Sequence, residues 1–407
     1  MTERVVNTQC CIAGGGPAGI MLGLLLAREG LDVVVLEKHA DFFRDFRGDT
    51  IHPSTLDLID QLGLREKFLA IRQSSITTLD VVVGGTRLTP IDFSGLRGPN
   101  RRIALMPQWD FLTLLAEAGA SHPGFHLVMG AEVVDVVYDD AGVAGVLART
   151  PAGMLRVRAP LTVAADGRDS AVRSLAGMAP VSYGVPIDVL WFRLPVPPNP
   201  PPDTLGYLQD GMVVITIPRP GYYQMGVLIP KGGLAAIQAA GLAAFRARLG
   251  RNVPFLVPAL ESVTGWEQVK LLSVQVDRLK HWSRPGLLCL GDAAHAMSPV
   301  FGVGVNYAVQ DAVAAARVLA PRLKAGSVRE RDLHRIQRRR ELPVRLMQPL
   351  QLTVHKVLAG GPLGARPLAR WQRRALTVAL PVARPLVARV VGRGFRPEKL
   401  VGDSRHH

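Results

Sequence analysis

Three glycines and one acid near the N-terminus have the spacing to bind a dinucleotide. Gly14, Gly16 and Gly19 form a Gly-x-Gly-x-x-Gly pattern that follows an apolar run and opens a helical one. The first glycine permits a tight turn, the second lets a pyrophosphate approach the backbone, and the third lets helix and strand pack closely. Glu37 ends the next apolar run, where its carboxylate can accept both ribose hydroxyls of an adenosine. A 2′-phosphate would repel Glu37, so the pattern favours FAD or NAD over NADP.

Two further motifs separate FAD from NAD. The first is Ala165-Asp166-Gly167-x-x-Ser170-x-Val172-Arg173. The second is Leu290-Gly291-Asp292-Ala293-Ala294-His295, followed by Pro299-x-x-Gly302-x-Gly304-x-Asn306. In order and spacing, across roughly residues 6–320, the chain resembles the p-hydroxybenzoate hydroxylase family of FAD-dependent (group A) aromatic hydroxylases.

The resemblance implies an FAD-dependent monooxygenase. Its substrate would be an aromatic, quinone-like or polyketide compound, hydroxylated or epoxidised through a flavin C4a-hydroperoxide. NADH or NADPH would act as a transient reductant and O2 as the oxygen donor. The flavin carries this chemistry, whereas the protein supplies positioning and a dry site. An FAD-dependent reductase of a prenyl or polyketide double bond is the alternative, since residues 222–232 loosely resemble a strand of geranylgeranyl reductases.

Physical roles can be assigned to several motif residues. Asp292 follows a strand, so its carboxylate can accept hydrogen bonds from ribityl hydroxyls. Gly302 and Gly304 let backbone N–H groups approach the flavin pyrimidine edge, where they would stabilise negative charge on the reduced ring. Pro299 would stiffen this loop. The predicted cofactor-binding residues are Gly14, Gly16, Pro17, Ala18, Gly19, Glu37, Lys38, Arg47, Gln108, Asp166, Gly291, Asp292, Pro299, Gly302, Gly304, Val305 and Asn306.

Some of these assignments rest on the resemblance alone. Arg47 and Gln108 are similar to residues of the family that meet FAD, and Arg44 is a further candidate of the same kind. For both arginines a surface salt bridge is the alternative. In the family, Asp166 would link FAD and nicotinamide binding and would not transfer protons.

The sequence offers fewer candidates for catalytic and substrate-binding residues than for cofactor-binding residues. His295 and Pro299 are the candidates for a catalytic role, and His52 is comparable to His295. No metal site is expected. Substrate-binding candidates lie on strands expected to cover the flavin, with ordinary sheet packing as the alternative; they are Trp191, Arg193, Tyr207 and Tyr223.

The elements that must position these residues begin with a βαβ unit over residues 6–37. It consists of a strand at 6–13, a helix at 17–28 and a strand at 31–37. Further on, the sequence predicts helices at 53–69, 106–120 and 307–319, an antiparallel meander within 125–166, a proline-rich surface loop at 195–202 and a last buried strand at 286–292. The helical segments that follow are predicted to be broken at Pro343, Pro362, Pro367, Pro381 and Pro385.

We therefore expect an α/β fold with a discontinuous, Rossmann-like FAD-binding domain. It comprises residues 1–68, 101–177 and 276–325. An inserted, mainly antiparallel β-sheet substrate domain comprises 69–100 and 178–275. Residues 326–407 form a basic helical C-terminal region.

The charge is unevenly distributed. The chain of 407 residues carries a net charge of +15, and residues 322–407 hold 20 Lys/Arg against 5 Asp/Glu. Nucleic-acid binding is not expected, because aromatic interleaving and known motifs are missing. The apolar residues of this region would cover the FAD domain. Its positive face either stays in water or docks onto anionic lipid or an acidic carrier protein that bears the substrate.

The three cysteines indicate the cellular compartment of the protein. Cys10, Cys11 and Cys289 lie in apolar runs, and the adjacent pair should point to opposite faces of a strand. They form no disulfide framework or metal spacing, which is typical of a reducing cytoplasm. Glycines and Pro17 interrupt the apolar stretch at 10–27, so we expect no targeting segment. The oligomeric state and the choice between NADH and NADPH stay open.

Overall fold

The computed structural model describes residues 3–43, 50–198, 200, 206–209, 211–360 and 370–400. At 359–360 and 370–378 it describes the backbone alone. Arg44, Arg47, Pro362 and Pro367 lie outside the described residues, as do residues 199, 201 and 202 of the predicted loop at 195–202.

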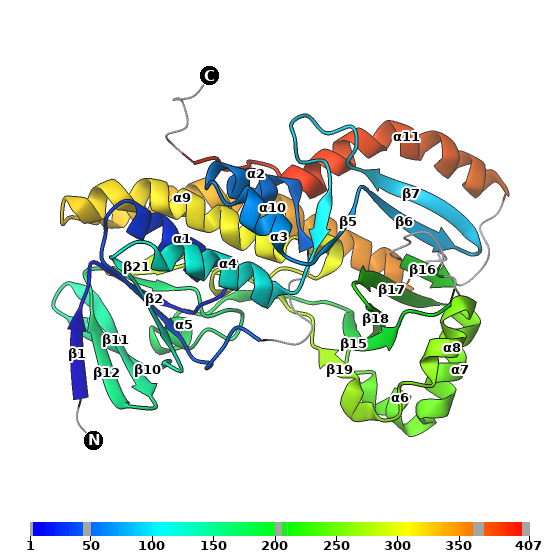
Figure 1. Cartoon of the computed structure of the whole chain (residues 1–407), viewed down its shortest axis with the longest axis horizontal. Helices are drawn as coiled ribbons and strands as arrows, with labels where there is room; N and C mark the ends of the chain where they lie inside the picture. The colour runs from blue at the N-terminus through cyan, green and yellow to red at the C-terminus, as the bar shows by residue number, and fades with distance from the viewer. Residues whose placement is uncertain are drawn as a thin grey trace.

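A six-stranded sheet of order β21-β22-β13-β2-β3-β9 forms the centre of the N-terminal part (Figure 1). Five of its strands are parallel, and β21 is antiparallel to β22. The strands are β2 (Cys10–Ala13), β3 (Val33–Glu37), β9 (Phe125–Met129), β13 (Thr162–Ala164), β21 (Ser283–Arg284) and β22 (Leu287–Cys289). The sheet thus joins segments from the beginning, middle and end of the chain.

Both faces of this sheet are covered, which explains why its central strands β2, β3, β13 and β22 are mainly apolar and buried. Helices α1 (Pro17–Arg28), α4 (Gln108–Ala120) and α9 (Gly304–Lys324) cover one face. On the other face lies a sheet of order β1-β12-β11-β10, with bounds β1 (Glu3–Asn7), β10 (Glu132–Asp139), β11 (Gly142–Thr150) and β12 (Gly153–Arg158). Cys10 packs on the helical side and Cys11 on the side of the second sheet, as predicted.

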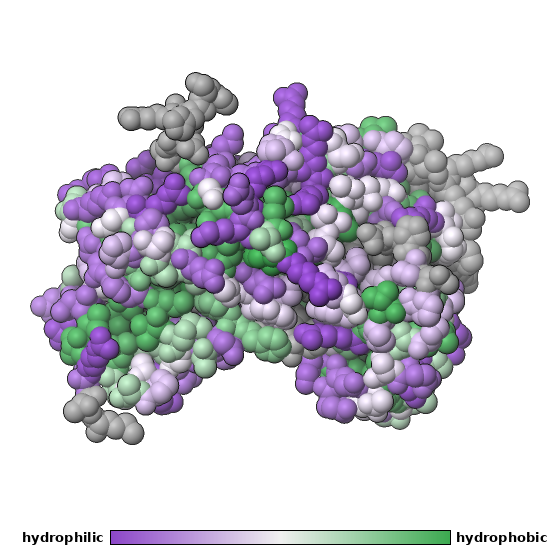
Figure 2. Space-filling model, in the orientation of Figure 1, coloured by the Kyte–Doolittle hydropathy of each residue, from purple (hydrophilic) through white to green (hydrophobic). Residues whose placement is uncertain are grey.

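A seven-stranded, mainly antiparallel sheet forms the second large part, with order β19-β15-β18-β17-β16-β6-β7. Its strands are β6 (Thr78–Val83), β7 (Thr86–Asp92), β15 (Ile187–Pro195), β16 (Gly206–Gln209), β17 (Met212–Arg219), β18 (Tyr222–Pro230) and β19 (Lys270–Leu272). Helices α6 (Leu234–Ala240), α7 (Leu242–Asn252) and α8 (Val257–Leu260) lie on one side of it, at the lower right of Figure 1. The surface in Figure 2 is indented between these helices and the N-terminal part.

Short elements join the two parts. A three-stranded sheet contains β4 (Thr50–Ile51), β8 (Ile103–Leu105) and β5 (Ser74–Ile76), and a two-stranded one contains β14 (Val181–Tyr183) and β20 (Val276–Arg278). The remaining short helices are α2 (Pro53–Gln61), α3 (Arg65–Ala70), α5 (Ala171–Leu175), η1 (Pro254–Leu256), η2 (Trp266–Gln268), η3 (Gly291–Ala293) and η4 (Val300–Gly302).

Two long helices follow, α10 (Glu330–Gly360) and α11 (Arg370–Arg393). The predicted breaks at Pro343, Pro381 and Pro385 are wrong, because both helices continue through their prolines. A proline inside a helix removes one backbone hydrogen bond. Burial of Val344 and Met347 from α10 and of Ala388 from α11 compensates for that loss.

Three other predicted elements differ from the structure in their extent. The strand expected at 6–13 is two strands in different sheets, β1 and β2. The helix expected at 53–69 is interrupted at Gly63, whose φ is 74°. The meander is restricted to β10–β12, whereas β9 and β13 run parallel in the larger sheet.

The predicted α/β fold class is confirmed by the two large sheets and their helices. The predicted domain boundaries stay a proposal, which the joining of β6 and β7 to β15–β19 supports. Within the described residues, none of the helices combines the length and the apolar character that crossing a bilayer requires.

Candidate functional site

The glycine turn between β2 and α1 is set by backbone packing. Gly14 has φ 108°, and a Cβ on it would lie 2.3 Å from the carbonyl oxygen of Ala165 in the loop after β13. A Cβ on Gly19 would lie 1.9 Å from the carbonyl oxygen of Gly14. Any side chain at either position would therefore push α1 away from the sheet.

The start of α1 has the properties of a pyrophosphate site. Gly16 caps the helix, Pro17 occupies its first turn, and that turn contains no acidic residue. A Cβ on Gly16 would have the Ala165 carbonyl oxygen at 3.9 Å as its nearest neighbour, so the space before the helix is open. Free N–H groups and the positive end of the helix dipole face this space. The residues present therefore fit a pyrophosphate.

Glu37 is held beside the same turn. It ends β3 and is buried, with Oε2 accepting from the Gly15 N–H at 2.9 Å and Oε1 from the His39 N–H at 3.0 Å. Each carboxylate oxygen has more than one lone pair, so both can accept further bonds. Lys38, the next residue, is exposed.

Asp292 lies at the ends of neighbouring strands. It follows β22, which pairs with β13, which pairs with β2, so it shares an edge of the sheet with the glycine turn. Its side chain is 30% exposed and lies 3.5 Å from a guanidinium nitrogen of Arg168. Gly291, with φ 58°, brings this turn against Ala18 of α1 and Ala308 of α9.

Asp166 has a different environment. Its oxygens accept from the Ser170 hydroxyl and from the Val172 N–H at 3.1 Å, and burial raises the pKa of this carboxyl. Arg173 is also buried and donates to the carbonyl oxygens of Ala293 and Arg168. These contacts brace the loop after β13 against η3.

A loop of residues 298–304, here called the η4 loop, connects η3 to α9. Phe301 within it has φ 67°, and it is the one non-glycine residue with positive φ in the described part of the chain. Thr50 donates to the carbonyl oxygen of Gly302 at 2.7 Å, and a Cβ on Gly302 would collide with Thr50. Asn306 accepts from the Thr55 hydroxyl and the His52 N–H and donates to the Thr50 carbonyl. β4 and α2 therefore fix this loop from one side.

Both histidine candidates are buried and make contacts that hold neighbouring segments together. His295 is buried, its Nε2 lies 2.6 Å from an oxygen of Asp311, and its ring stacks on Trp282. Burial pushes the pKa of Asp311 upward, but the charge and hydrogen bond of His295, together with Arg340, hold it below its usual value. His52 Nδ1 lies 2.9 Å from the Val391 carbonyl oxygen, and burial lowers the pKa of His52 to about 4.

The four substrate candidates divide between the two faces of the seven-stranded sheet. Trp191 packs with Val189 and Ile217 on the face that also contacts Phe301. Arg193 shares the alternation of Trp191 along β15, and its guanidinium lies over the Tyr222 ring. Tyr207 and Tyr223 instead pack on Phe255 at the opposite face. Because side chains alternate along a strand, these two tyrosines do not belong with Trp191.

Gln108 and the arginine candidates complete the prediction. Gln108 is the first residue of α4 and is partly exposed; its neighbour Trp109 stacks on Phe43 at 4.7 Å. Arg47 and Arg44 fall outside the described residues.

Residues that the sequence reasoning missed lie mainly on α10. Gln348, Gln351 and His355 are buried and bond the η4 loop and the residues before it. Their spacing of three and four places them on one face of the helix. The available signal was that these polar residues recur at helical spacing with the buried apolar residues Val344 and Met347.

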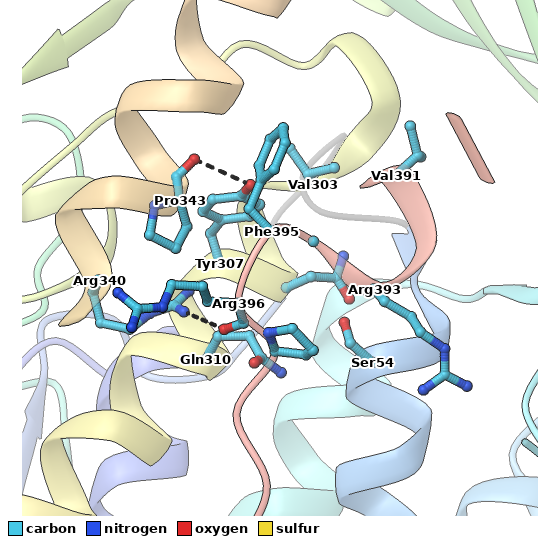
Figure 3. A pocket seen from close by; sticks show the side chains of 13 residues that line it. Ser54, Val303, Tyr307, Gln310, Arg340, Pro343, Val391, Arg393, Phe395 and Arg396 are labelled. Atoms are coloured by element: carbon cyan, nitrogen blue, oxygen red, sulfur yellow. Dashed lines mark hydrogen bonds between the residues drawn. The ribbon is translucent and has the colours of Figure 1, made fainter. Parts of the chain in front are cut away.

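Neither of the two cavities described next corresponds to a flavin site, because one is too small and the other lies at the wrong end of β3. One, between α2, α9, α10 and residues 393–397, has a volume of about 10 Å³, enough for a water molecule (Figure 3). In it, Tyr307 donates to the Pro343 carbonyl and Arg340 to the Arg396 carbonyl. The other, of about 360 Å³, includes Asp32, at the opposite end of β3 from Glu37. It adjoins β1 and β12, near the apolar surface at the lower left of Figure 2.

Comparison with known proteins gives consistent results. A family model described as an FAD binding domain matches residues 7–347. The 6-methylpretetramide 4-monooxygenase of Streptomyces rimosus is 33% identical over 338 residues, covering 82% of this chain and 80% of the relative. The protoasukamycin 4-monooxygenase of Streptomyces nodosus subsp. asukaensis is 28% identical, covering 79% and 81%. The structure of p-nitrophenol 4-monooxygenase from Pseudomonas putida has a TM-score of 0.75 at 20% identity, covering 93% and 94%, and shows likeness of fold alone.

Proposed function

This chain belongs to the family of FAD-dependent aromatic hydroxylases similar to p-hydroxybenzoate hydroxylase, and on that premise we propose that its substrate is an aromatic polyketide. The enzyme is an FAD-dependent monooxygenase that uses NAD(P)H and O2. The relatives support this activity over reduction of a prenyl or polyketide double bond. When bound, FAD supplies the activation of O2 and the oxygen transfer.

The proposed cofactor site lies along one edge of the six-stranded sheet. The first turn of α1 would bind the pyrophosphate, Glu37 the adenosine ribose and Asp292 the ribityl hydroxyls. The N–H groups of the η4 loop and of the start of α9 would meet the pyrimidine edge of the flavin, where they would stabilise negative charge. Arg168, beside Asp292, would turn toward solvent or toward the cofactor.

One observation carries the proposed place of the substrate. The Phe301 side chain packs both against the core under the six-stranded sheet and against the Trp191 face of the seven-stranded sheet. That face is apolar, with Val189, Ile215 and Ile217 beside Trp191. The Trp191 indole N–H is buried and has no acceptor among the described residues. Such a face suits a polycyclic aromatic compound whose oxygen accepts from the indole.

Oxygen incorporation tests this proposal. Purified protein with FAD and NAD(P)H is offered 6-methylpretetramide, other aromatic polyketides and simple phenols under 18O2. We expect substrate-dependent O2 consumption and a product heavier by one 18O atom for a polyketide. Reduction of a double bond without O2 uptake would overturn the monooxygenase assignment. Turnover of phenols alone would overturn the polyketide proposal.

The outer face of α10 favours a further role, contact with an anionic membrane surface. Leu342, Leu346 and Leu350 are exposed at intervals of four residues, and Val357 continues the same face. Exposed cations flank them on that face; these are Arg331, Arg335, Arg338, Arg345 and Lys356. Of the acids on α10, Asp332 is buried, Glu341 is partly exposed, and the exposed Glu330 lies at the start of the helix. Apolar side chains among cations are typical of a helix that lies in a lipid interface.

Vesicle sedimentation tests this contact. We expect binding to vesicles that contain phosphatidylserine, weaker binding at about 0.3 M than at about 0.05 M salt because charges are screened, and none to neutral vesicles. Leu346→Glu should abolish binding, whereas Val181→Glu, at an exposed position on β14, should not. Binding to an acidic carrier protein but not to vesicles would overturn the membrane proposal in favour of carrier docking.

We also propose that the protein works in a reducing cytoplasm. The three cysteines are free and buried. A protein that forms no structural disulfide suits such a compartment. Cell fractionation would test this location.

A further inference from the structure

The side chain of Gln351, on α10, pairs with the backbone of the η4 loop. Its Oε1 accepts from the Ser298 N–H at 3.2 Å, and its Nε2 donates to the carbonyl oxygens of Ser298 at 3.0 Å and Val300 at 2.9 Å. Gln351 is fully buried, and its two bonds to Ser298 are buried with it, whereas the bond to Val300 is part-buried. The side-chain amide thus pairs with backbone N–H and C=O groups of the loop, as the backbone of a neighbouring strand would.

His355, one helical turn further, contacts the same loop. Its Nε2 lies 2.7 Å from the Ser298 hydroxyl oxygen, which also accepts from the Val300 N–H at 3.0 Å. Burial lowers the pKa of His355 to about 4, so the ring is neutral near pH 7 and carries one N–H. Nδ1 is buried without a partner in the described part of the chain. A proton on Nε2 therefore avoids burying an unpaired donor.

Gln348 extends the contact to the residues before the loop. Its Nε2 donates to the carbonyl oxygens of Asp277 and Ala296, at 2.8 and 3.1 Å. Its Oε1 accepts from Arg278 at 2.9 Å. Gln348, Gln351 and His355 thus hold residues 296–300 along one face of α10.

The loop held in this way is conformationally strained. Phe301 has φ 67°, a region that a bulky side chain rarely adopts and that persists when the surroundings over-determine it. Thr50 and Asn306 hold the loop on one side, and α10 holds it on the other. The backbone amides at the start of α9 therefore depend on α10 for their position.

We propose that Gln351 and His355 are positioning residues for the flavin and that α10 latches the η4 loop in the conformation that meets the cofactor. The latch rests on the proposed assignment of this loop to FAD. A loosened loop presents its N–H groups poorly and admits water. FAD then binds more weakly, and more of the NAD(P)H is consumed without product, as NAD(P)H + H⁺ + O2 → NAD(P)⁺ + H2O2.

A matched pair of variants on the same helix tests the latch. Gln351→Leu removes the contacts to the loop. Gln337→Leu is the control, because Gln337 is also buried and bonds backbone, accepting from Trp282 N–H at 3.0 Å and donating to the Lys280 carbonyl at 2.7 Å. It lies about 21 Å away along the helix axis. Both substitutions leave buried backbone groups unpaired, so both should lower the melting temperature.

Only Gln351→Leu should change the binding and the midpoint potential of the flavin. We expect Gln351→Leu to weaken FAD binding at least tenfold, to shift the flavin midpoint potential and to speed hydrogen exchange of residues 296–304 at least tenfold. Gln337→Leu should keep the FAD dissociation constant within about twofold of the unaltered protein. Equal FAD affinity, midpoint potential and loop exchange in the two variants would overturn the latch.

Milder variants keep the test decisive if Gln351→Leu does not fold. Ser298→Ala removes the hydroxyl that joins His355 to the Val300 N–H, and it should weaken FAD binding several-fold. His355→Gln keeps a donor and should retain the affinity, whereas His355→Leu should not. Equal FAD affinity in all three would overturn the proposal. An unaltered protein that binds no FAD would overturn the proposed function, while hydrogen exchange without FAD would still test the latch.

Discussion

At the scale of single residues, two carboxylates at one edge of a sheet differ because their surroundings differ. Asp166 is buried and accepts from Ser170 and Val172 of its own loop, and burial raises its pKa. Asp292 is part-exposed and shares its charge with Arg168 at 3.5 Å. Asp166 therefore stabilises its own loop. Asp292, whose contact with Arg168 is long, can instead accept hydrogen bonds from the hydroxyls of a ligand.

Asp292→Ala should weaken FAD retention. Hydrogen bonds to a charged group contribute about 1.5–3 kcal/mol, so we expect affinity to fall about 10–100-fold. Fluorescence titration of the apoprotein with FAD measures this change. Asp169→Ala is the control, since Asp169 is an exposed acid of the nearby loop and should leave affinity unaltered. Unchanged affinity in Asp292→Ala would remove this residue from the cofactor site.

His52 should make stability depend on pH. Burial lowers its pKa from 6.5 to about 4, so between these values the unfolded chain binds more protons than the folded protein. Stability is then complete above pH 6.5 and falls as the pH drops, by about 2 kcal/mol at pH 5, until the loss levels off near pH 4. His52→Asn keeps a donor for the Val391 carbonyl. Urea unfolding of this variant should show a fall between pH 7.5 and 5 that is smaller by about 2 kcal/mol; an identical fall would contradict the assignment.

The sequence predicted local site residues better than distant ones. The glycine turn and Glu37 are a contiguous βαβ unit, so spacing alone indicated their place. The sequence did not indicate that Tyr223 and Trp191 lie on opposite faces of their sheet, because this depends on the strand register, which pairs Trp191 with Gly226, 35 residues away. His295 lies in a recognised motif, but its partner Asp311 is one of many acids in the sequence, and only packing joins them.

At the scale of elements, a buried ionic network ties three segments together. Asp311 of α9 accepts from His295 and from Arg340 of α10. Arg340 also donates to the Arg396 carbonyl and lies 3.8 Å from Glu398. The chain after α11 is thereby held against α9 and α10, beside the cavity in Figure 3.

Arg340→Met should be strongly destabilising. It leaves Asp311 and Glu398 buried with less countercharge, which typically costs about 3–5 kcal/mol. Arg345→Met is the matched control on the same helix, because Arg345 is exposed and lies 3.7 Å from Glu341; we expect a change under about 0.5 kcal/mol. Thermal and urea unfolding with saturating FAD measure both. Similar losses in the two variants would show that the network does not stabilise the fold.

The βαβ unit was predictable because β2 and β3 are continuous apolar runs and the glycine turn with Pro17 marks the start of α1. The lengths of α10 and α11 were not predictable, because the prolines within them predict helix ends, although the helices continue through them. Gln348, Gln351 and His355 gain partners only when α10 packs on the η4 loop, about 50 residues earlier in the chain. Polar residues on a buried face are informative only once the partner segment is known.

At the scale of the whole molecule, the two large sheets meet at the η4 loop. Phe301 contacts both cores, and α11 closes over the second through Ala388 and Val391. In Figure 1, α11 lies along β7, with α2 beside its C-terminal end. A substrate on the Trp191 face would therefore touch the segment that positions the cofactor.

This geometry predicts that substrate accelerates reduction of the flavin by NAD(P)H. Because the proposed substrate face adjoins the η4 loop, a bound substrate would change the loop's packing around Phe301. Reduction without substrate would consume NAD(P)H and release H2O2, so gating by substrate avoids that loss. Anaerobic stopped-flow mixing should show reduction at least tenfold faster with the true substrate. Trp191→Ala, which removes the indole and alters none of the proposed cofactor-binding residues, should reduce the acceleration by more than it alters the basal rate. Equal rates with and without substrate in the unaltered protein would contradict gating, because reduction would then not sense the Trp191 face.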